Sequence, residues 1–402
     1  MTGMRAYLKA LSVPGALRFV GPAFLARFPG AMIGIALTLM VSGLYQEYSL
    51  AGLVGGCWTV AAAVGAPLVG RLIDRHGQSR VGFPLVVITT SATVGLIICA
   101  VNQAHWGWLV VTAAVSGLAG FPMGSLTRSR WSHLLGADPL LQSAFALESM
   151  FDDVAFIAGP TVATIVATAV WPRLGVHPEA AMVLSATILA LGVVLFLSQR
   201  STEPPVKPVE RQASAIRIAG VPLVAVVFVG IGVIFGANDI TMVAVAEGLG
   251  HKAWSGPILG LGSVASMTGA LVYGSRAWRM SLVRRFVIGL VCVAGTSLLF
   301  LLAFDWWSLI VVSVLSGLAI SPSFINGNTL IQRIVPAHNL TEGLTWIGTA
   351  LLVGIAAGGA VAGRVIDRFG PHSGFWVLAV GCVMAIAVGA AAGRTLGRRV
   401  TS

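Results

Sequence analysis

Residues 70–80 read GRLIDRHGQSR, a short charged stretch that separates two apolar segments, 50–70 and 81–101. Each flanking segment has the about 20 mostly apolar residues that a helix needs to cross a bilayer. Gly77 allows a tight turn between them, and Gly70 allows two helices to approach each other closely. The stretch therefore predicts two membrane-spanning helices joined by a charged turn.

The composition of the whole chain agrees with a membrane protein. Of its 402 residues, 56% are hydrophobic and 10% are charged, and the mean hydropathy is +0.90. A soluble domain carries about 25% charged residues, so an ordinary soluble enzyme is excluded. High hydrophobicity also argues against disorder. We attribute the net charge of +11 to cytoplasmic loops and expect the lipid bilayer, not nucleic acid, as the partner.

Apolar segments of spanning length recur along the chain. They predict an all-α integral membrane protein with 12 transmembrane helices. The four cysteines lie inside apolar runs without partner motifs, so we expect neither disulfides nor a metal site. The predicted spans are 19–43, 50–70, 81–101, 106–127, 142–169, 179–198, 219–240, 254–274, 286–304, 307–328, 341–362 and 374–393.

The basic residues orient these spans. Of the 25 Lys and Arg residues, 20 fall on the side that holds both termini, four fall on the other side, and Arg27 lies inside a span. Because basic residues favour cytoplasmic loops, we expect both termini in the cytoplasm. We expect a multi-pass protein of the cell (inner) membrane of a bacterium, without a cleavable signal peptide.

The sequence also indicates an internal duplication. SGLAGFP at 116–122 matches SGLAISP at 316–322, an offset of 200 residues. Parallel repeats of this kind build transporters that bind substrate between their halves. We predict an N-terminal six-helix bundle at 1–198, a cytoplasmic linker at 199–218 and a C-terminal six-helix bundle at 219–402.

Residues 70–80 resemble the signature loop of the major facilitator superfamily, Gly-x-Leu-x-Asp-Arg-x-Gly-Arg-Lys. Gln78 and Ser79 replace the usual basic pair. The resemblance implies two six-helix bundles related by a pseudo-twofold axis. It also implies that Asp74 and Arg75 help to lock the two halves in the outward-open state, although a solvated charged turn remains the alternative. The matching residues are Gly70, Leu72, Asp74, Arg75 and Gly77.

A second copy, GRVIDRFG at 363–370, follows the eleventh predicted span. By the predicted topology it faces outward, unlike the family signature. We interpret it as a charged turn, with a gate element of the outer face as the alternative.

Charged residues inside spans are costly and usually functional. Arg27 lies roughly 12 Å deep, and Glu148 and Asp152 lie roughly 9 and 15 Å deep from the same side, at about 1.5 Å per residue. Glu148 and Asp152 share a helix face, whereas Asp153 points elsewhere. Since the resemblance places the first and fifth spans close together, we expect a cluster of Arg27 with both carboxylates. It serves either proton coupling and substrate anchoring or a static ion pair.

Further polar residues lie in spans of the second half. Asn238 and Asp239 stand near the predicted outer end of the seventh span, and Asn326 stands in the tenth. Each is a candidate for proton or substrate binding. The alternatives are an interfacial cap for Asp239 and a hydrogen bond between helices for Asn326.

Gly159 and Pro160 in the fifth span resemble the Gly-Pro core of the antiporter motif of this superfamily. Thr161, Val162 and Ala163 replace the paired glycines that normally follow, and an ordinary helix kink is the alternative. We include both residues among the candidate gating residues, and this match favours efflux over uptake.

No catalytic, nucleotide-binding or cofactor motif is present in the sequence, so we expect neither an enzyme nor a bound cofactor. Transport must then use an ion or substrate gradient. The sequence predicts a monomeric, drug/proton antiporter-like secondary transporter that exports a small organic compound in exchange for protons. The alternatives are a proton symporter or uniporter importing a sugar or organic acid, and a non-transporting membrane receptor or scaffold.

Overall fold

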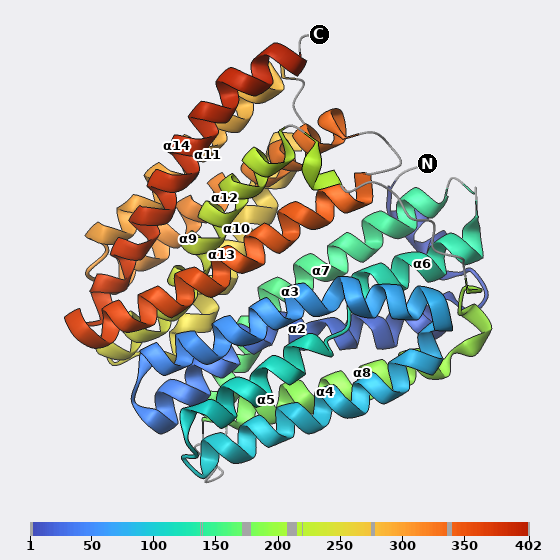
Figure 1. Cartoon of the computed structure of the whole chain (residues 1–402), viewed down its shortest axis with the longest axis horizontal. Helices are drawn as coiled ribbons and strands as arrows, with labels where there is room; N and C mark the ends of the chain where they lie inside the picture. The colour runs from blue at the N-terminus through green and yellow to red at the C-terminus, as the bar shows by residue number, and fades with distance from the viewer. Residues whose placement is uncertain are drawn as a thin grey trace. The chain divides into compact units, whose positions relative to one another are not determined.

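The computed structural model describes residues 3–136, 138, 140–170, 178–206, 215–218, 220–274, 278–335 and 340–400 (Figure 1). Within these residues the chain is helical and has no strand, and 12 helices are long and apolar enough to cross a membrane. The predicted fold class is therefore confirmed.

The helices follow the predicted spans in order along the chain. In the first half they are α1 (Gly3–Leu11), α2 (Ala16–Tyr45), α3 (Tyr48–His76), α4 (Gln78–Val101), α5 (Trp106–Leu118), α6 (Met123–Leu135), α7 (Leu140–Ile165), the π-helix η1 (Val166–Val170) and α8 (Ala180–Ser198). In the second half they are α9 (Val221–Gly248), α10 (Ser255–Gly274), α11 (Leu282–Leu298), α12 (Trp306–Ile334), α13 (Leu340–Phe369) and α14 (Phe375–Val400).

Several helices extend beyond the predicted apolar segments. Helix α3 continues through the signature stretch to His76, α9 continues to Gly248, and α13 continues to Phe369. The fourth predicted span consists of α5 and α6, and α6 ends at Leu135 rather than at residue 127. Backbone hydrogen bonding does not require apolar side chains, so a helix can pass the point where the hydrophobic pattern stops.

The chain divides into two compact units. Unit 1 comprises residues 1–40 and 61–210, and unit 2 comprises residues 41–60 and 211–402. Residues 41–60, which hold the end of α2 and the start of α3, therefore cluster with unit 2. The predicted bundle boundaries at 198 and 219 stay a prediction.

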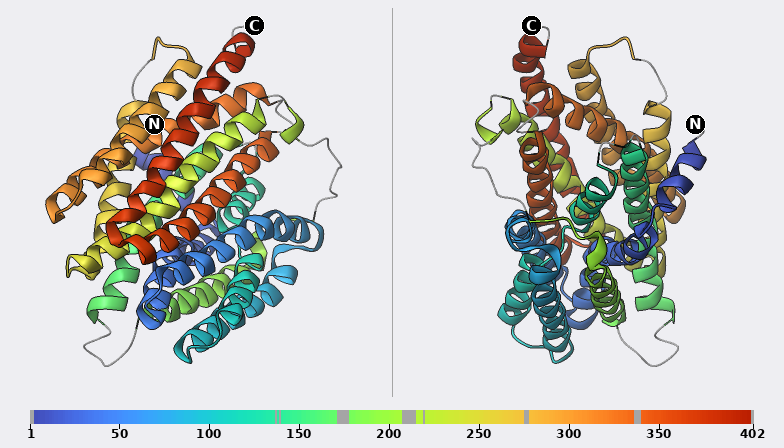
Figure 2. Two further views of the ribbon diagram at one scale, coloured as in Figure 1. Left: turned by 60° about the vertical axis from the view of Figure 1, so that its left-hand side comes forward. Right: turned by 90° about the vertical axis from the view of Figure 1, so that its right-hand side faces the viewer.

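In unit 1, α4 packs against both α5 and α8, and the three helices lie side by side in Figures 1 and 2. At one end of the unit the aromatic rings of Phe19, Trp131 and Phe196 pack edge to face. The Phe19 ring centroid lies 5.2 Å from that of Trp131 and 6.5 Å from that of Phe196. This core joins α2, α6 and α8 next to the charged cluster described below.

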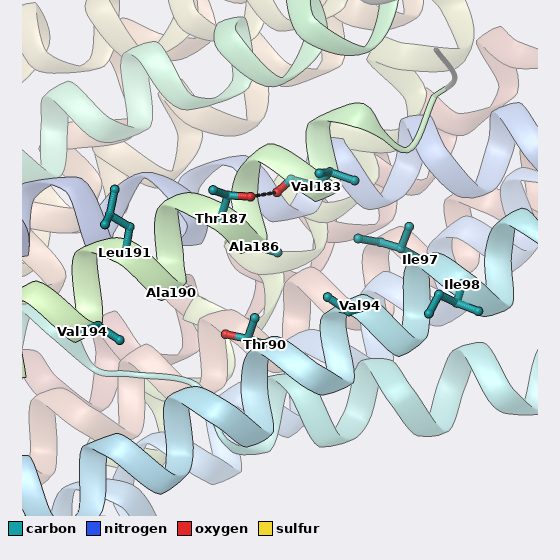
Figure 3. A pocket seen from close by; sticks show the side chains of 10 residues that line it. All are labelled: Thr90, Val94, Ile97, Ile98, Val183, Ala186, Thr187, Ala190, Leu191 and Val194. Carbon is teal, nitrogen blue, oxygen red and sulfur yellow. Dashed lines mark hydrogen bonds between the residues drawn. The ribbon is translucent and has the colours of Figure 1, made fainter.

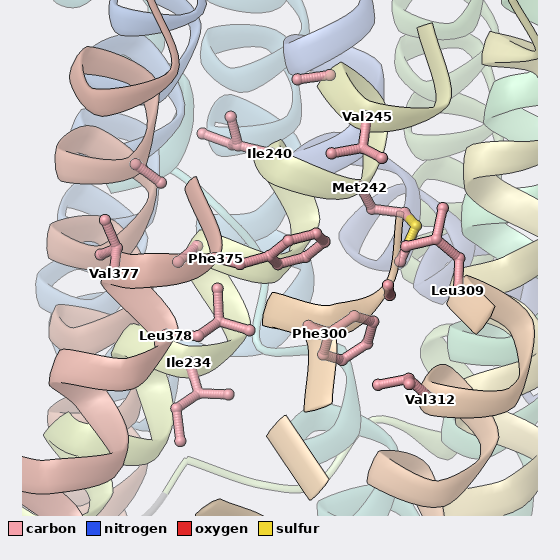
Figure 4. Close-up of a cluster of buried hydrophobic side chains, with 14 of the residues drawn as sticks. Ile234, Ile240, Met242, Val245, Phe300, Leu309, Val312, Phe375, Val377 and Leu378 are labelled. Atoms are coloured by element: carbon pink, nitrogen blue, oxygen red, sulfur yellow. The ribbon is translucent and has the colours of Figure 1, made fainter. Parts of the chain in front are cut away.

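In unit 2, α9 packs against α13 and α14 (Figures 1 and 2). Figure 4 shows one of its apolar clusters, in which side chains of α9, α12 and α14 meet the stacked rings of Phe300 and Phe375, 5.1 Å apart. The α9–α13 contact depends on glycine. A Cβ added at Gly236 would lie 1.9 Å from the Ile355 carbonyl oxygen. Close backbone approach through small residues is a common way for helices to associate in membranes.

Helix α12 begins with a capping box outside the predicted span. The Asp305 carboxylate accepts hydrogen bonds from the backbone N–H groups of Trp307 (2.9 Å) and Ser308 (3.0 Å). The Ser308 hydroxyl lies 3.2 Å from the Asp305 backbone nitrogen, which donates to it. The backbone N–H of Ser308 is the main reason that the pKa of the Asp305 carboxyl lies below its usual value.

Candidate functional site

The predicted cluster of Arg27 with two carboxylates is present in unit 1. Arg27 projects from α2 and is 7% exposed. Its Nη2 donates to the Glu148 carboxylate and, at 2.7 Å, to the Thr127 hydroxyl. Its Nε lies 2.8 Å from Asp152 Oδ1. One arginine therefore faces two acids of α7, as the depth estimate from the sequence predicted.

The two acids differ in burial although they stand one helical turn apart. Glu148 is 0% exposed and also accepts a hydrogen bond of 2.7 Å from Trp131 Nε1. The Asp152 side chain is 34% exposed, and its second oxygen lies 3.4 Å from Arg128 Nη2. Glu148 is thus enclosed by its partners, whereas the Asp152 side chain is open on one side.

Helix α6 supplies Thr127, Arg128 and Trp131, and the prediction missed all three. Thr127 and Trp131 are four residues apart and lie on one helix face, so both reach Glu148 or Arg27. The predicted fourth span ends at residue 127, which leaves Arg128 outside it. The polar and aromatic residues at 129–131, Ser-Arg-Trp, do not continue the apolar pattern, so nothing in the sequence indicated that the helix goes on.

The ion pairs of this cluster are shared unequally between the two arginines. Two carboxylates share Arg27, and Arg128 contacts only the exposed one of them. The Nη1 atom of Arg27 is buried without a hydrogen-bond partner among the described residues. An unsatisfied buried donor costs about 1–3 kcal/mol. The site can therefore gain from a ligand that brings an acceptor oxygen.

Asp153, also predicted at the site, is exposed on α7. Its side chain makes no hydrogen bond or ion pair within the described part of unit 1. The structure therefore brings together Arg27, Glu148 and Asp152 but leaves Asp153 beside them.

Asn238 and Asp239 lie inside helix α9, which continues beyond the predicted span to Gly248. Asp239 is about 13 Å from that helix end at 1.5 Å per residue. The interfacial cap stays one of the two alternatives for Asp239. Asp239 has no hydrogen bond or ion pair in the described part of unit 2. Asn238 Oδ1 is buried there without a partner as well.

Asn326 is 1% exposed and belongs to a polar group between α10, α11 and α12. Its Oδ1 accepts a hydrogen bond of 2.8 Å from the Tyr273 hydroxyl, which lies 3.4 Å from Arg285 Nη1. The Trp278 ring stacks on Tyr273 at 4.7 Å. The hydrogen bond between helices, given as the alternative for Asn326, is therefore present.

The signature stretch is mostly helical. Asp74 and Arg75 are exposed in the last turn of α3, and their side chains make no hydrogen bond or ion pair within the described part of unit 1. Gly77 has a φ of +91° and makes the predicted turn into α4. Among the described residues, no atom lies within 4 Å of a Cβ built at Gly70, so the close helix contact expected at this glycine stays a prediction.

The two residues that depart from the signature are buried. The Ser79 backbone N–H donates to Glu203 Oε1 at 2.8 Å, and the Gln78 side-chain oxygen accepts from Arg130 Nε at 2.8 Å. Glu203 comes from the segment after α8, so this segment is tied to the start of α4. Polar partners from elsewhere in unit 1 thus take the place of the missing basic pair.

Arg130 is a second buried arginine that the prediction assigned to a loop. It is 0% exposed, and its guanidinium carbon lies 3.9 Å from the Phe196 ring centroid. Its Nη1 donates to Thr202 Oγ1 (2.9 Å) and to the Gln199 carbonyl (2.8 Å). Arg130 therefore fastens the chain after α8 to the end of α6.

The Gly-Pro pair lies where α7 meets α2. A Cβ at Gly159 would lie 2.9 Å from the Ala31 Cβ, so the glycine permits this close contact. Pro160 stands inside α7, and the helix changes to the π-helix η1 at Val166. The pair is thus a packing point about two helical turns from Asp152 and about three from Glu148.

The copy GRVIDRFG is not a turn, so that interpretation is wrong. Helix α13 includes residues 363–369 and ends at Phe369. The carboxylate of Asp367 binds the first backbone N–H groups of α3.

A groove of about 670 Å³ between α4 and α8 lies away from these residues (Figure 3). Its lining is aliphatic apart from Thr90 and Thr187, and the Thr187 hydroxyl is bonded to the Val183 carbonyl at 2.8 Å. Several lining side chains, Ile98 and Leu191 among them, are about half exposed. On a membrane span such a surface faces lipid, so the groove is no candidate for the polar site.

Metal and disulfide chemistry have no support in the described residues. Among them no group of three or more His, Cys, Asp or Glu side chains could hold a metal ion. All four cysteines are free thiols in the structure.

The comparisons with known proteins give one family. The family model of the Major Facilitator Superfamily matches residues 23–305 and 277–396. No curated protein matches the chain.

Solved structures with a similar fold include three transporters. The nucleoside transporter NupG is 15% identical, with a TM-score of 0.68 over 96% of this chain and 99% of that one. The POT family transporter PepTSo is 10% identical, with a TM-score of 0.70 over 97% and 98%. A bacterial homologue of the iron transporter ferroportin, in an inward-facing state, is 14% identical, with a TM-score of 0.70 over 97% and 99%.

Proposed function

The chain belongs to the major facilitator superfamily, and we propose from this premise that it is a proton-coupled secondary transporter that exports a small organic compound. The observation that carries the proposal is Asp152. It is a partly exposed carboxylate inside a membrane span, placed between two arginines. Ionisable groups in such positions usually belong to ion or substrate pathways.

In this proposal Asp152 is the acid that binds and releases the proton. When Asp152 is charged, Arg27 and Arg128 both stabilise it. When it is protonated, both ion pairs weaken, and the arginines can turn to acceptor oxygens of a substrate. Opposite charges favour the ionised form of a carboxylate, and burial favours its neutral form. Proton binding and substrate binding then compete at one place.

Glu148 has a different role. Its carboxylate is enclosed by Arg27 and Trp131 and is fully buried, so it keeps Arg27 in place while Asp152 changes its charge. Removing one partner of a buried ion pair costs about 3–5 kcal/mol. We therefore assign Glu148 to positioning and Asp152 to coupling.

Asp239 and Asn238 are proposed as a second polar site in unit 2. An unpaired carboxylate inside α9 is costly unless it is protonated or meets a ligand. Asn326, already bonded to Tyr273, would contribute less. Asp153 is retained as a candidate that water reaches.

Export is favoured by the Gly159–Pro160 pair, which resembles the antiporter motif. One observation supports the second candidate, import of an organic acid by proton symport. The two arginines at Asp152, with the buried Nη1 of Arg27 unsatisfied, suit a carboxylate ligand.

The remaining proposals concern the arrangement of the chain. The protein works as a monomer in the bacterial inner membrane, with both termini in the cytoplasm and bundles at 1–198 and 219–402 joined by the linker 199–218. Asp74 and Arg75 help to hold the outward-open state, together with the turn at Gly77 and the packing point at Gly159–Pro160.

The test is transport by the purified protein in lipid vesicles. A panel of small organic cations, neutral compounds and organic acids is offered with and without an imposed pH gradient. We expect at least one compound to move against its gradient when protons flow the other way. Movement in the same direction as protons would favour the symport of an organic acid, and no response to the pH gradient with any transported compound would contradict proton coupling.

A further inference from the structure

The first turn of α3 is capped by a carboxylate from a different helix. Asp367 Oδ1 accepts a hydrogen bond of 2.9 Å from the Tyr48 backbone N–H, and Oδ2 accepts one of 2.6 Å from that of Ser49. The first four N–H groups of a helix have no partner within it. A side chain normally caps its own helix, whereas here α13 caps α3.

The same end of α3 packs closely on α13 through glycine. A Cβ at Gly52 would lie 2.3 Å from the Gly359 carbonyl oxygen, and a Cβ at Gly363 would lie 2.2 Å from that of Tyr48. Both contacts are with backbone atoms, which cannot turn aside as a side chain does. The two helices therefore fit only while these positions carry no side chain.

A third contact ties this end of α3 to α9. The Tyr48 hydroxyl donates to the Glu247 carboxylate, and Lys252 Nζ donates to the other Glu247 oxygen at 2.9 Å. The distribution of basic residues predicts that this end faces outward. Tyr48 thus takes part in the backbone cap and in the side-chain contact.

These contacts lie within unit 2 and tie residues 41–60 to its helices α9 and α13. Residues 41–60 belong to unit 2, but they continue into unit 1 at both Met40 and Ala61. Any movement of one unit against the other must therefore bend α2 and α3 or release these contacts. Asp367 is exposed, and an exposed cap contributes only about 1 kcal/mol, which suits a contact that breaks and reforms.

The sequence around Asp367 repeats the signature stretch. GRVIDRFG at 363–370 differs from GRLIDRHG at 70–77 at two positions only. Both copies end a long helix at a glycine with a left-handed backbone, Gly77 at φ +91° and Gly370 at φ +93°. The copy at Asp367 is engaged with a helix terminus in this structure.

We propose that Asp367, bound to the start of α3, is a releasable latch on the predicted outer side of the protein. We call the Asp367 contacts with Tyr48 and Ser49 the α3 latch. It is closed in one state of the transport cycle and open in the other. The proposal rests on transport by alternating access but not on the identity of the substrate or on proton coupling.

The test measures a distance rather than transport. Spin labels are placed at Glu47→Cys, an exposed residue just before α3, and at Phe369→Cys, which is 70% exposed at the end of α13. The background protein lacks its four native cysteines, and the distance distribution is measured by pulsed electron resonance in lipid nanodiscs. We expect a short distance for the closed latch.

The variant Asp367→Ala removes the cap and should raise the ratio of long-distance to short-distance protein about fivefold, which corresponds to about 1 kcal/mol. The matched control is Asp305→Ala, which removes the same two kinds of hydrogen bond from α12, a helix that Asp305 caps itself. The control should leave the distribution unchanged. An unchanged distribution for Asp367→Ala, or an equal change for Asp305→Ala, would overturn the proposal.

A second variant guards against a folding defect in the first. Gly52→Ala places a Cβ against the Gly359 carbonyl and should also favour the long distance, without touching any charge. If both variants remain folded and neither changes the distance distribution relative to the parent protein, the latch does not exist. If the distances shift but a pH gradient drives no transport, the latch stands and the proposed proton coupling fails.

Discussion

Glu148 and Asp152 stand one helical turn apart, and this small separation gives them different surroundings. Glu148 is fully buried and accepts hydrogen bonds from Arg27 and Trp131. Asp152 is partly exposed and forms ion pairs with Arg27 and Arg128. The stability of the protein should therefore depend on the first acid more than on the second.

We predict that Glu148→Gln lowers the free energy of unfolding by about 3–5 kcal/mol, because it leaves Arg27 with one partner fewer in a buried site. Asp152→Asn should cost clearly less, since water screens its ion pairs. Thermal unfolding in detergent, followed by circular dichroism, compares the two variants. Equal losses would show that both acids are structural.

The sequence predicted part of this cluster. Arg27, Glu148 and Asp152 could be placed together because depth along a helix follows from residue number. The contributions of Arg128 and Trp131 could not be predicted, because a charged and aromatic stretch after an apolar run looks like the end of a helix. The length of a helix depends on contacts that the hydrophobic pattern does not contain.

At the scale of helices, the contact between α9 and α13 rests on glycines whose neighbours are backbone atoms. We predict that Gly236→Ala destabilises the protein by about 1–3 kcal/mol, because its Cβ would overlap the Ile355 carbonyl of α13. The control is Gly348→Ala on α13, where a Cβ would meet no atom within 4 Å and alanine favours the helix. Thermal unfolding measures both, and equal midpoints would contradict the packing argument.

The end of α3 carries the signature residues in an exposed position. We predict that Asp74→Asn slows transport by a measurable factor, because it removes the charge that we propose helps to hold the outward-open state. Arg71→Gln is the control, since the signature leaves that position of the same helix open. Initial transport rates in vesicles compare the two variants. An unchanged rate for Asp74→Asn would mean that the segment is a solvated helix end without a part in transport.

The sequence could not separate these glycines by role. Gly70 and Gly77 stand in one short stretch, but only Gly77 has a backbone conformation that requires glycine, and no atom of the described residues lies within 4 Å of a Cβ built at Gly70. The contact of Asp367 could not be predicted either, because its partners are the backbone N–H groups of Tyr48 and Ser49, more than 300 residues earlier in the chain. Contacts across such distances depend on the fold.

At the scale of the whole molecule, the spans and their number followed from composition and hydropathy alone, and the family comparison agrees with them. The orientation in the membrane is a prediction from the basic residues. It stays open to a direct test.

We predict that a cysteine at Pro205→Cys, exposed after α8, is not modified by a membrane-impermeant thiol reagent added outside intact cells. A cysteine at His251→Cys, exposed after α9, should be modified. Both variants are made in a protein without its native cysteines. Labelling at 205 and protection at 251 would mean that the topology is inverted.

The most direct measurement is proton movement in vesicles that contain either the wild type or Asp152→Asn, with a transported compound from the panel. Asp305→Asn serves as the control, because asparagine also caps a helix and the residue lies outside the polar site. We predict that the compound causes proton flux with the wild type and the control but not with Asp152→Asn, while binding of the compound persists. Equal proton flux with Asp152→Asn would contradict the assignment of coupling to the Arg27–Glu148–Asp152 cluster.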